Sequence, residues 1–258
     1  MNTPPDFVFS FNHQKNRIIR LNETESTNDF AKQLQMQPFE NEVIIIADYQ
    51  TKGRGNAGNS WESESGKNLT FSIILKPHFL EPSLQFLLNK VIALGIYDFV
   101  SDKLNSSNVK IKWPNDIYVG NKKIAGTLIE HSIIGSQLEK SIVGIGININ
   151  QTVFTSNAPN PISLSNITNA VYPLKDTLIQ LMNFIFIRYQ ELKDKKIKQL
   201  DIDYLNQLYC LNEYKTYNYQ GEKIKASIQG VNKFGQLQLL SENNNLISCS
   251  FKEIEFDL

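Results

Sequence analysis

The stretch that decides how this chain is organised covers residues 48 to 61 and reads Asp48-Tyr49-Gln50-Thr51-Lys52-Gly53-Arg54-Gly55-Asn56-Ala57-Gly58-Asn59-Ser60-Trp61. An apolar run at residues 43–47 leads into it, and a second apolar run at residues 69–75 follows it. Short continuous apolar runs that are bounded by turn residues are typical of buried β-strands. The pattern therefore predicts two core strands joined by a long glycine-rich loop.

The loop combines four glycines with two basic side chains, in the set Gly53, Gly55, Gly58, Gly66, Lys52 and Arg54. Glycine lets backbone N–H groups converge on an anion because no Cβ stands in the way. Lysine and arginine add charge-assisted donors. The spacing is neither that of a Walker P-loop nor that of the dinucleotide fingerprint. On composition alone, a plain turn and a loop that binds a phosphate or carboxylate fit equally well.

Four further segments accompany the glycine loop in a fixed order along the chain. They are Glu25-Ser26-Thr27-Asn28, Lys112-Trp113-Pro114-Asn115-Asp116-Ile117, Lys122-Lys123-Ile124-Ala125-Gly126-Thr127-Leu128-Ile129-Glu130 and Gly144-Ile145-Gly146-Ile147-Asn148-Ile149-Asn150. Together with the loop they span roughly residues 17 to 150, and the set resembles the biotin–protein ligases. The Lys-Trp-Pro-Asn-Asp and Lys-Ile-Ala-Gly pieces are the most specific part of this resemblance.

The resemblance implies an α+β fold in which a class II synthetase-like catalytic domain, residues 1–210, has a central mixed or antiparallel sheet flanked by helices. It also implies a small C-terminal SH3-like β-barrel at residues 211–258. The residues agree, because about five short strand patterns separated by turns follow Tyr214. Helical spacing of apolar residues predicts helices at residues 82–104 and 174–192 and a short helix at residues 201–208.

Several local expectations complete the fold. Residues 1–16 are predicted to form a loose lead-in before a first strand at residues 17–21. Ser26 or Thr27 is predicted to cap a helix that ends before Pro38, and on that pattern alone the cap explains these residues fully. A strand is predicted at residues 140–150, where Gly144 and Gly146 indicate close backbone approach to a ligand. Residues 162–167 give no strong prediction.

The Lys-Trp-Pro-Asn-Asp segment lies between a predicted strand at residues 109–113 and a hairpin whose turn is Gly120-Asn121. A turn centred there places Tyr118 opposite Lys123 and Asp116 opposite Ala125. Asp116 and Lys123 then project from the same face as diagonal neighbours. A surface salt bridge explains a lone pair of this kind, but the adjacent Trp113-Pro114-Asn115 segment favours a site where carboxylate and ammonium flank a reacting group.

The resemblance implies two reactions, in which biotin and ATP give biotinyl-AMP and the biotinyl group then passes to one lysine of a biotin carboxyl carrier domain. It implies that biotin is bound by Ser26, Thr27, Asn28, Gln50, Gly53, Arg54, Gly55, Asn56, Lys123 and Gly126. It implies that ATP and the adenylate are bound by Arg54, Asn59, Trp61, Asn115, Lys123 and Asn148. Trp61 equally fits plain core packing. Mg²⁺ is expected with ATP, and no dedicated protein metal site is expected.

The chemistry assigns three catalytic candidates. Two anions, the biotin carboxylate and the α-phosphate, must meet, so positive charge is needed between them. Lys123 is the candidate for that role, and Arg54 with the loop amides would help close over the adenylate. Asp116 is the candidate that accepts a proton from the incoming lysine.

Composition restricts the remaining classes. The 258 residues carry 26 basic and 26 acidic side chains, which gives no bias toward nucleic acid or an anionic membrane. Two isolated cysteines and three scattered histidines show no metal-ligand spacing. The absence of a signal-peptide pattern and the shortness of apolar runs such as residues 184–187 predict a cytoplasmic protein without membrane contact. Fewer than 30 residues precede Ser26, so we expect the ligase-only form without a DNA-binding domain.

Some alternatives stay open at this stage. Asn56, Ala57 and Asn59 stand where basic residues are common in the family, so the grip on the adenylate is in question. A lipoate or octanoate transferase shares the fold, although its motifs differ. A non-catalytic biotin-binding module belongs to another class, against which the presence of Lys123 argues. Members of the family often pair through the central sheet, so the resemblance is compatible with a homodimer, and the sequence does not name the carrier protein.

Overall fold

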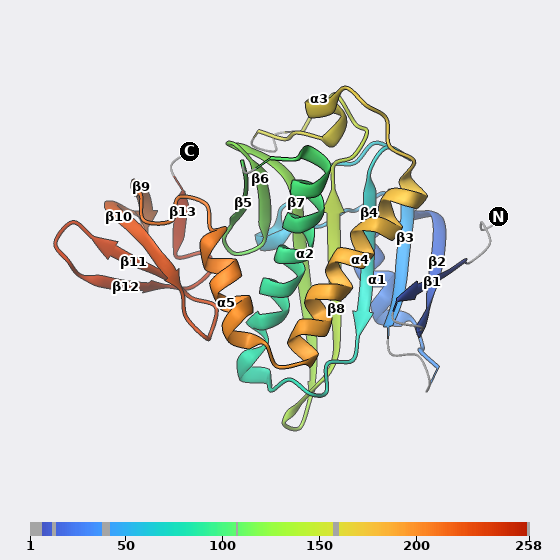
Figure 1. Ribbon diagram of the computed structural model, residues 1–258, viewed down its shortest axis with the longest axis horizontal. Coiled ribbons are helices and arrows are strands. Elements are labelled where there is room, and N and C mark those ends of the chain that lie inside the picture. Colours follow the sequence, from blue (N-terminus) through green and yellow to red (C-terminus); the bar gives the residue numbers. More distant parts are fainter. Residues whose placement is uncertain (1–6, 12–13, 38–41, 107, 157–159, 257–258) are drawn as a thin grey trace.

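A computed structural model describes residues 7–11, 14–37, 42–106, 108–156 and 160–256. Its main element is an eight-stranded sheet in the order β1-β2-β3-β4-β8-β7-β6-β5 (Figure 1). The β2–β3 pair is parallel and the other neighbouring pairs are antiparallel, which confirms the predicted mixed sheet. The strands are β1 (Phe7–Phe11), β2 (Gln14–Thr24), β3 (Glu42–Gln50), β4 (Leu69–Leu75), β5 (Val109–Lys112), β6 (Asp116–Val119), β7 (Lys122–Ile134) and β8 (Gln137–Ile147).

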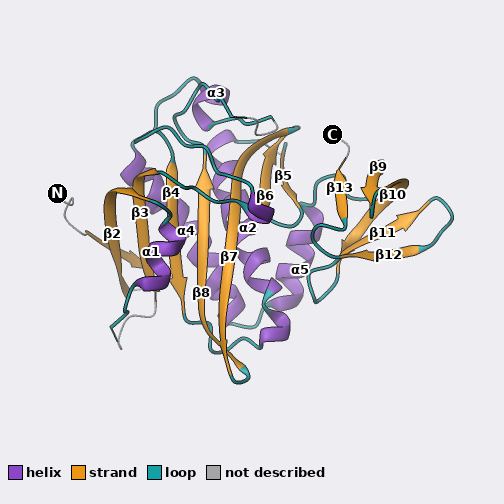
Figure 2. Ribbon diagram, turned by 180° about the vertical axis from the view of Figure 1, so that it is seen from behind, coloured by secondary structure: helices purple, strands orange, loops and turns teal. Residues whose placement is uncertain are grey.

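Helices cover both faces of this sheet, as predicted. The long helices α2 and α4 lie on one face, and α1 lies on the other together with the glycine loop (Figures 1 and 2). The α-helices are α1 (Thr27–Gln33), α2 (Phe86–Leu104), α3 (Leu164–Thr168), α4 (Leu174–Lys193) and α5 (Ile197–Asn206), and short 3₁₀ turns occupy Asn56–Gly58 and Pro82–Leu84.

Burial on both faces explains why the central strands are continuously apolar in sequence. All seven residues of β4 are buried, as are the first six of β3. Odd and even residues of a strand point to opposite faces, so a strand covered on both sides is apolar at most positions, and the buried polar residues Glu42, Thr70 and Ser72 of these strands have hydrogen-bond partners. The larger core lies between the sheet and α2 and α4, and a smaller one lies under α1, around Ala31, Ile45 and Ile74.

The segment Pro82–Leu104 is long and apolar enough, by length and composition alone, to cross a membrane. In the sequence this segment is predicted as a helix, and the apolar runs weighed as membrane spans were shorter. In the structure 61% of its apolar window is buried, and its helix packs against α4 and the sheet. A core helix therefore accounts for this segment, and the expected absence of membrane contact stays a prediction.

The C-terminal residues form a second, five-stranded antiparallel sheet in the order β12-β11-β10-β9-β13. Its strands are β9 (Tyr214–Tyr219), β10 (Glu222–Val231), β11 (Leu237–Ser241), β12 (Leu246–Cys249) and β13 (Ile254–Phe256), so the five predicted strands are confirmed. This C-terminal module packs at the β5 end of the main sheet, beside α5 (Figure 1). The placement of the domain boundary between residues 210 and 211 stays a prediction.

One apolar cluster continues from the main sheet into the C-terminal module, through Tyr217, Ile228 and Leu237. A hydrogen bond also joins the two parts, because Trp113 Nε1 donates to the carbonyl of Gly235 at 2.9 Å. The indole is 5% exposed, so its single donor group would otherwise be buried without a partner. The tryptophan of the Lys-Trp-Pro-Asn-Asp segment thus fastens the C-terminal module to the main sheet.

One local prediction was wrong, and one segment without a prediction forms a helix. Residues 7–11 and 14–24, expected as a lead-in and a short strand, form an antiparallel pair at the sheet edge; residues 1–6 and 12–13 of the expected lead-in lie outside the described residues. Residues 164–168, which gave no prediction, form α3, whose start is fixed by a capping box between Ser163 and Asn166. That signal was present in the sequence but was missed, because asparagine replaces the usual glutamate or glutamine.

The β6–β7 hairpin has the predicted turn but not the whole predicted register. Tyr118 pairs with Lys123 as expected, whereas Asp116 pairs with Gly126 and not with Ala125. A register shift between Ile117 and Tyr118 causes the difference. An extra residue on one strand is a β-bulge, which alternation counted from the turn cannot reveal.

Helices α2 and α4 approach each other at Gly95, where a Cβ would lie 2.6 Å from the Cα of Ile185. Alanine normally stabilises a helix by about 1 kcal/mol relative to glycine. Here the added methyl must push the helices apart, so we expect Gly95→Ala to destabilise the fold by about 1–3 kcal/mol. Urea denaturation measures this change, and a gain in stability would show that the helices are not in close contact.

Candidate active site

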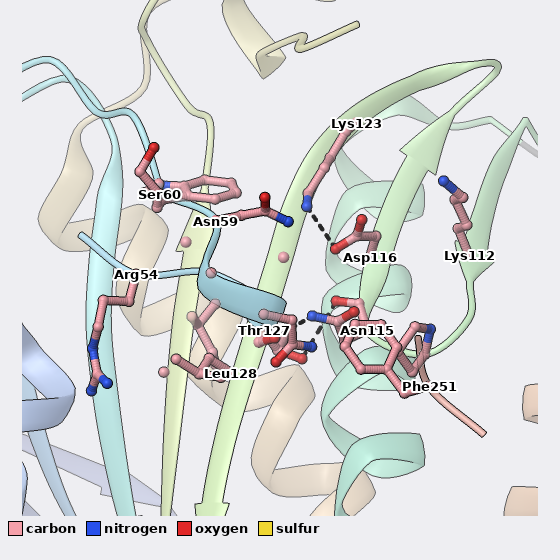
Figure 3. A pocket seen from close by; sticks show the side chains of 18 of the residues that line it. Arg54, Asn59, Ser60, Lys112, Asn115, Asp116, Lys123, Thr127, Leu128 and Phe251 are labelled. Carbon is pink, nitrogen blue, oxygen red and sulfur yellow. Dashed lines mark hydrogen bonds and ion pairs between the residues drawn. The ribbon is translucent and has the colours of Figure 1, made fainter. Parts of the chain in front are cut away.

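A cavity of about 480 Å³ opens on the face of the main sheet that carries α1, under the glycine loop (Figure 3). Thirteen of the residues predicted from the sequence line it: Ser26, Thr27, Asn28, Gln50, Arg54, Gly55, Asn56, Asn59, Trp61, Asn115, Asp116, Lys123 and Gly126. Gly53 and Asn148 were predicted with them but are not among the lining residues. Segments separated by about 100 positions in the sequence thus share one cavity.

The Ser26-Thr27-Asn28 segment is both a helix cap and part of this cavity wall. Ser26 Oγ accepts a hydrogen bond from the Asp29 backbone N–H, which is the predicted cap. Gln50 Oε1 accepts from the backbone N–H of Thr27 at 2.8 Å and from its hydroxyl at 3.1 Å. The cap explanation alone was therefore incomplete, because the cap also presents polar groups to the cavity.

The glycines of β8 make room for side chains of this chain. A Cβ at Gly144 would collide with the carboxamide of Asn28, and one at Gly146 would collide with the indole of Trp61. The close approach expected at these glycines therefore comes, in this structure, from Asn28 and Trp61. Both side chains are held directly against the floor of the cavity.

Lys123 and Asp116 lie next to each other on one face of the hairpin, as predicted, and they form an ion pair with Nζ and Oδ1 2.7 Å apart (Figure 3). Their side chains are 27% and 19% exposed, so the pair lies in the wall rather than in open solvent. Gly126 provides the space beside it, because a Cβ there would lie 3.2 Å from both charged groups. Lys123 also lies 5.7 Å from the centre of the Trp61 ring.

A second lysine, Lys112, lies on the other side of Asp116 (Figure 3). Burial lowers the pKa of Lys112, although the nearby Asp116 carboxylate opposes this effect. Its ammonium lies 4.8 Å from the ring centre of Phe256 and 5.0 Å from that of Tyr118. Lys112 belongs to a motif in the sequence, but no role was predicted for it.

The remaining polar candidates have partners within the protein. Asn115 Nδ2 donates to the carbonyl of Thr127, and Asn148 Nδ2 donates to the carbonyl of Ile162 at 3.0 Å. Among the described residues, Asn148 Oδ1 and Trp61 Nε1 are buried without a hydrogen-bond partner. Buried polar groups are normally satisfied, so Trp61 in particular has an unused donor at the cavity wall. The adenylate roles predicted for these three residues stay predictions.

Arg54 lies differently from the expectation of a phosphate-facing side chain. Its Nη2 is 2.7 Å from Asp29 Oδ1 and 3.4 Å from Glu130 Oε2. Figure 3 shows its guanidinium directed away from Lys123. Arg54 therefore forms ion pairs with α1 and β7 in this structure, and its predicted part in the chemistry is not tested by this geometry.

The C-terminal module supplies part of the wall through Phe251, Ile254, Glu255 and Phe256. None of these residues was predicted, because a docking contact between two sheets leaves no local pattern in the sequence. Phe251 packs edge-on against Trp113 with ring centres 6.2 Å apart. One sequence feature could have indicated this contact: a buried Trp113 needs an acceptor for its indole N–H, and Gly235 of the C-terminal module provides it.

Within the described residues, no group of three or more histidine, cysteine, aspartate or glutamate side chains could hold a metal ion. The carboxylates in the cavity wall are Asp116, which is paired with Lys123, and Glu255. These residues do not fit a resident metal centre. The Mg²⁺ that the resemblance implies would therefore be held by ATP rather than by a protein metal site.

Comparison with known proteins agrees with this geometry. Residues 21–148 match the biotin/lipoate A/B protein ligase family. The biotin–[acetyl-CoA-carboxylase] ligase of Paracoccus denitrificans is 30% identical over 177 residues, which is 65% of this chain and 70% of that protein. A biotin protein ligase from Aquifex aeolicus in complex with biotin and ATP has a TM-score of 0.77 at 28% identity, over 92% of this chain and 97% of that one.

The overall fold of this chain is therefore similar to that of a solved biotin protein ligase. The chain belongs to the biotin/lipoate A/B protein ligase family. The match to the bifunctional ligase/repressor BirA of Bacillus subtilis, 33% identical over 129 residues, covers 49% of this chain but only 38% of that protein.

The burial of the charged Lys112 side chain predicts a cost to folding stability that can be measured. Its lowered pKa means that the folded protein bears the full burial penalty at neutral pH, and that the penalty falls as pH rises from the lowered pKa toward 10.5. We expect Lys112→Met to change stability at pH 7 by between zero and a gain of roughly 2 kcal/mol, with the gap shrinking at alkaline pH. Urea denaturation at several pH values tests this. A large loss at pH 7 would contradict it.

Proposed function

We propose that this protein is an ATP-dependent biotin–protein ligase, which forms biotinyl-5′-AMP and transfers the biotinyl group to a lysine of a biotin carboxyl carrier domain. The observation that supports this most directly is the Lys123–Asp116 pair in the wall of a cavity that the glycine loop covers. The family shown above includes both biotin and lipoate enzymes. Biotin is favoured because relatives from Paracoccus and Aquifex carry biotin in their names.

In the first reaction an oxygen of the biotin carboxylate attacks the α-phosphorus of ATP, and the bond to the β-phosphate breaks to release pyrophosphate. Both reactants are anionic, so their approach needs a cation at the point where they meet. We assign this role to the ammonium of Lys123, which lies beside the open space at Gly126. Magnesium arrives with ATP and neutralises part of the phosphate charge.

In the second reaction the amine of the carrier lysine attacks the acyl carbon, and AMP leaves. The amine must be neutral to attack, and the nitrogen must lose a proton as the amide forms. Asp116 is the carboxylate in the wall closest to Lys123, and we assign it the role of proton acceptor. Because the adenylate is a mixed anhydride, the glycine loop must also exclude water during its lifetime.

The decisive experiment supplies the protein with biotin, MgATP and a biotin carboxyl carrier domain and measures the mass of the carrier. The proposal expects a mass gain of one biotinyl group that depends on ATP. A parallel incubation with lipoate or octanoate tests the alternative within the family. Pyrophosphate release with biotin and ATP separates a ligase from a module that only binds biotin.

Lys123 provides a sharper test, because its neighbour offers a matched control. Lys123→Ala should lower adenylate formation about 10²–10³-fold, as expected for loss of one preorganised charge at a reacting centre. Lys122→Ala removes the same charge one residue away, from an exposed side chain outside the cavity wall, and should change little. Pyrophosphate release measures both. Near-normal adenylation by the Lys123 variant would refute the assignment.

The glycine loop gives a further expectation. Asn56 and Asn59 line the cavity where basic residues are common in the family, so fewer charge-assisted bonds hold the adenylate. Each such bond contributes roughly 1.5–3 kcal/mol, so Asn56→Arg should lengthen the residence of biotinyl-AMP about tenfold or more. Dissociation from the preloaded enzyme measures this.

The matched control is Ser65→Arg, which adds the same charge to an exposed position of the same segment outside the cavity. It should leave the residence time unchanged. If the native protein already retains the adenylate as long as the Asn56 variant does, backbone amides suffice to hold it.

A further inference from the structure

A cluster of four charged side chains lies beside the cavity where α1, the glycine loop and β7 meet. Arg54 lies 2.7 Å from Asp29 and 3.4 Å from Glu130, and Lys32 lies 3.2 Å from Asp29 and 2.8 Å from Glu130. The two acids thus each contact both bases. The hydrogen bond to Glu130 also raises the pKa of Lys32. Alternating charges of this kind form a network rather than isolated pairs.

Glu130 connects this network to the buried floor of the cavity. Its Oε2 accepts a hydrogen bond from Asn28 Nδ2 at 2.9 Å, and the same oxygen faces Arg54. The carboxamide of Asn28 is fixed further by Ser72, whose hydroxyl donates to Asn28 Oδ1 at 2.6 Å. Asn28 Nδ2 also donates to the carbonyl of Leu128 at 3.2 Å. Asn28 is 3% exposed, so the orientation of its amide depends on these three partners together.

We propose that Glu130 is a positioning residue that orients Asn28 in the biotin pocket and, with Asp29, anchors the glycine loop through Arg54. This inference rests on the proposed function. Arg54 then acts on the adenylate through the loop that it holds, and not as a direct phosphate ligand. Glu130 itself is absent from the cavity wall, so its effect must pass through Asn28 and Arg54.

Geometry within the loop shows why an anchor at Arg54 matters. The residues on either side of Arg54 form a small closed turn, in which Gly55 N–H donates to Asn59 at 2.7 Å and Trp61 N–H donates to Gly53 at 2.9 Å. Because these bonds join the turn only to itself, its placement over the cavity depends on contacts with the rest of the protein. Arg54 supplies such contacts, to one residue on α1 and one on β7.

Arg54 could act as a direct phosphate ligand or as an anchor of the loop, and these two roles predict opposite effects of Glu130→Gln on the rate at which biotinyl-AMP dissociates. If Arg54 binds phosphate directly, removing the competing carboxylate charge frees it, and the adenylate stays bound as long or longer. If Arg54 is an anchor, the same substitution loosens the loop, and biotinyl-AMP dissociates roughly tenfold faster. Biotin alone should bind about fivefold more weakly, because a neutral acceptor replaces a charged one at Asn28.

The experiment compares Glu130→Gln, Arg54→Ala and the double variant with the native protein, measuring biotin affinity and adenylate dissociation. Arg54→Ala should also release the adenylate about tenfold faster while changing biotin affinity within about twofold. The double variant should release the adenylate no faster than Arg54→Ala alone, because Arg54→Ala already removes the contact that Glu130→Gln weakens. The control Glu242→Gln breaks an exposed pair with Lys225 far from the cavity and should change neither quantity.

Hydrogen exchange supplies a readout that a general loss of stability would not give. Amides of residues 53–61 should exchange faster in both single variants, while amides of β4 should keep their protection. Asp29→Asn removes the other anchor and should act in the same way if Glu130→Gln fails to fold. Unchanged or slower adenylate release in Glu130→Gln, or additive effects in the double variant, overturns the inference. Failure of the native protein to form biotinyl-AMP overturns the proposed function itself.

Discussion

The arrangement of the site depends most on the backbone pairing of β6 with β7. This short hairpin sets Asp116 opposite Gly126 and leaves Lys123 free to reach back to it. The bulge between Ile117 and Tyr118 is essential to that outcome, because it changes which residues stand opposite one another. The hairpin is held in turn by Asn115, whose carboxamide and carbonyl both bond to Thr127 on β7. Side-chain chemistry here is therefore positioned by strand register rather than by loop flexibility.

The glycine loop and the C-terminal module close the cavity from different sides. The loop brings Arg54, Asn56 and Trp61 across the sheet, and the module brings Phe251 and Phe256 to the opposite wall. Trp61 and Trp113 have comparable roles, since Trp61 packs the glycine loop against Gly146 of β8 and Trp113 joins the main sheet to the C-terminal module. Trp113 satisfies its donor at Gly235, whereas Trp61 keeps a buried donor without a partner among the described residues. Within the described part of the chain, the cavity wall thus has a satisfied indole donor on the side of the C-terminal module and an unpaired one on the side of the glycine loop.

Much of the fold could be predicted from sequence because the signals were local. The apolar run of residues 69–75 became β4 with the expected bounds, and the periodic segment at residues 174–192 became α4. The site residues that cluster in motifs were also found, because each motif supplies several groups to one cavity. The lining residues Phe251 and Phe256 could not be predicted, since they reach the cavity only through the packing of one sheet against another. The ion pairs of Arg54 with Asp29 and Glu130 were hidden for the same reason, because their partners are distant in sequence.

The continuous apolar core has a consequence for how this protein folds. Tyr217, Ile228 and Leu237 belong to the same buried cluster as the residues under α2, so the border near residue 210 divides the topology but not the core. Separating the two parts would expose apolar surface on both and leave the Trp113 donor without its acceptor. We therefore expect the two sheets to unfold as one cooperative unit. Loss of the small sheet would also remove one wall of the cavity. Here catalytic competence and global stability draw on the same contacts.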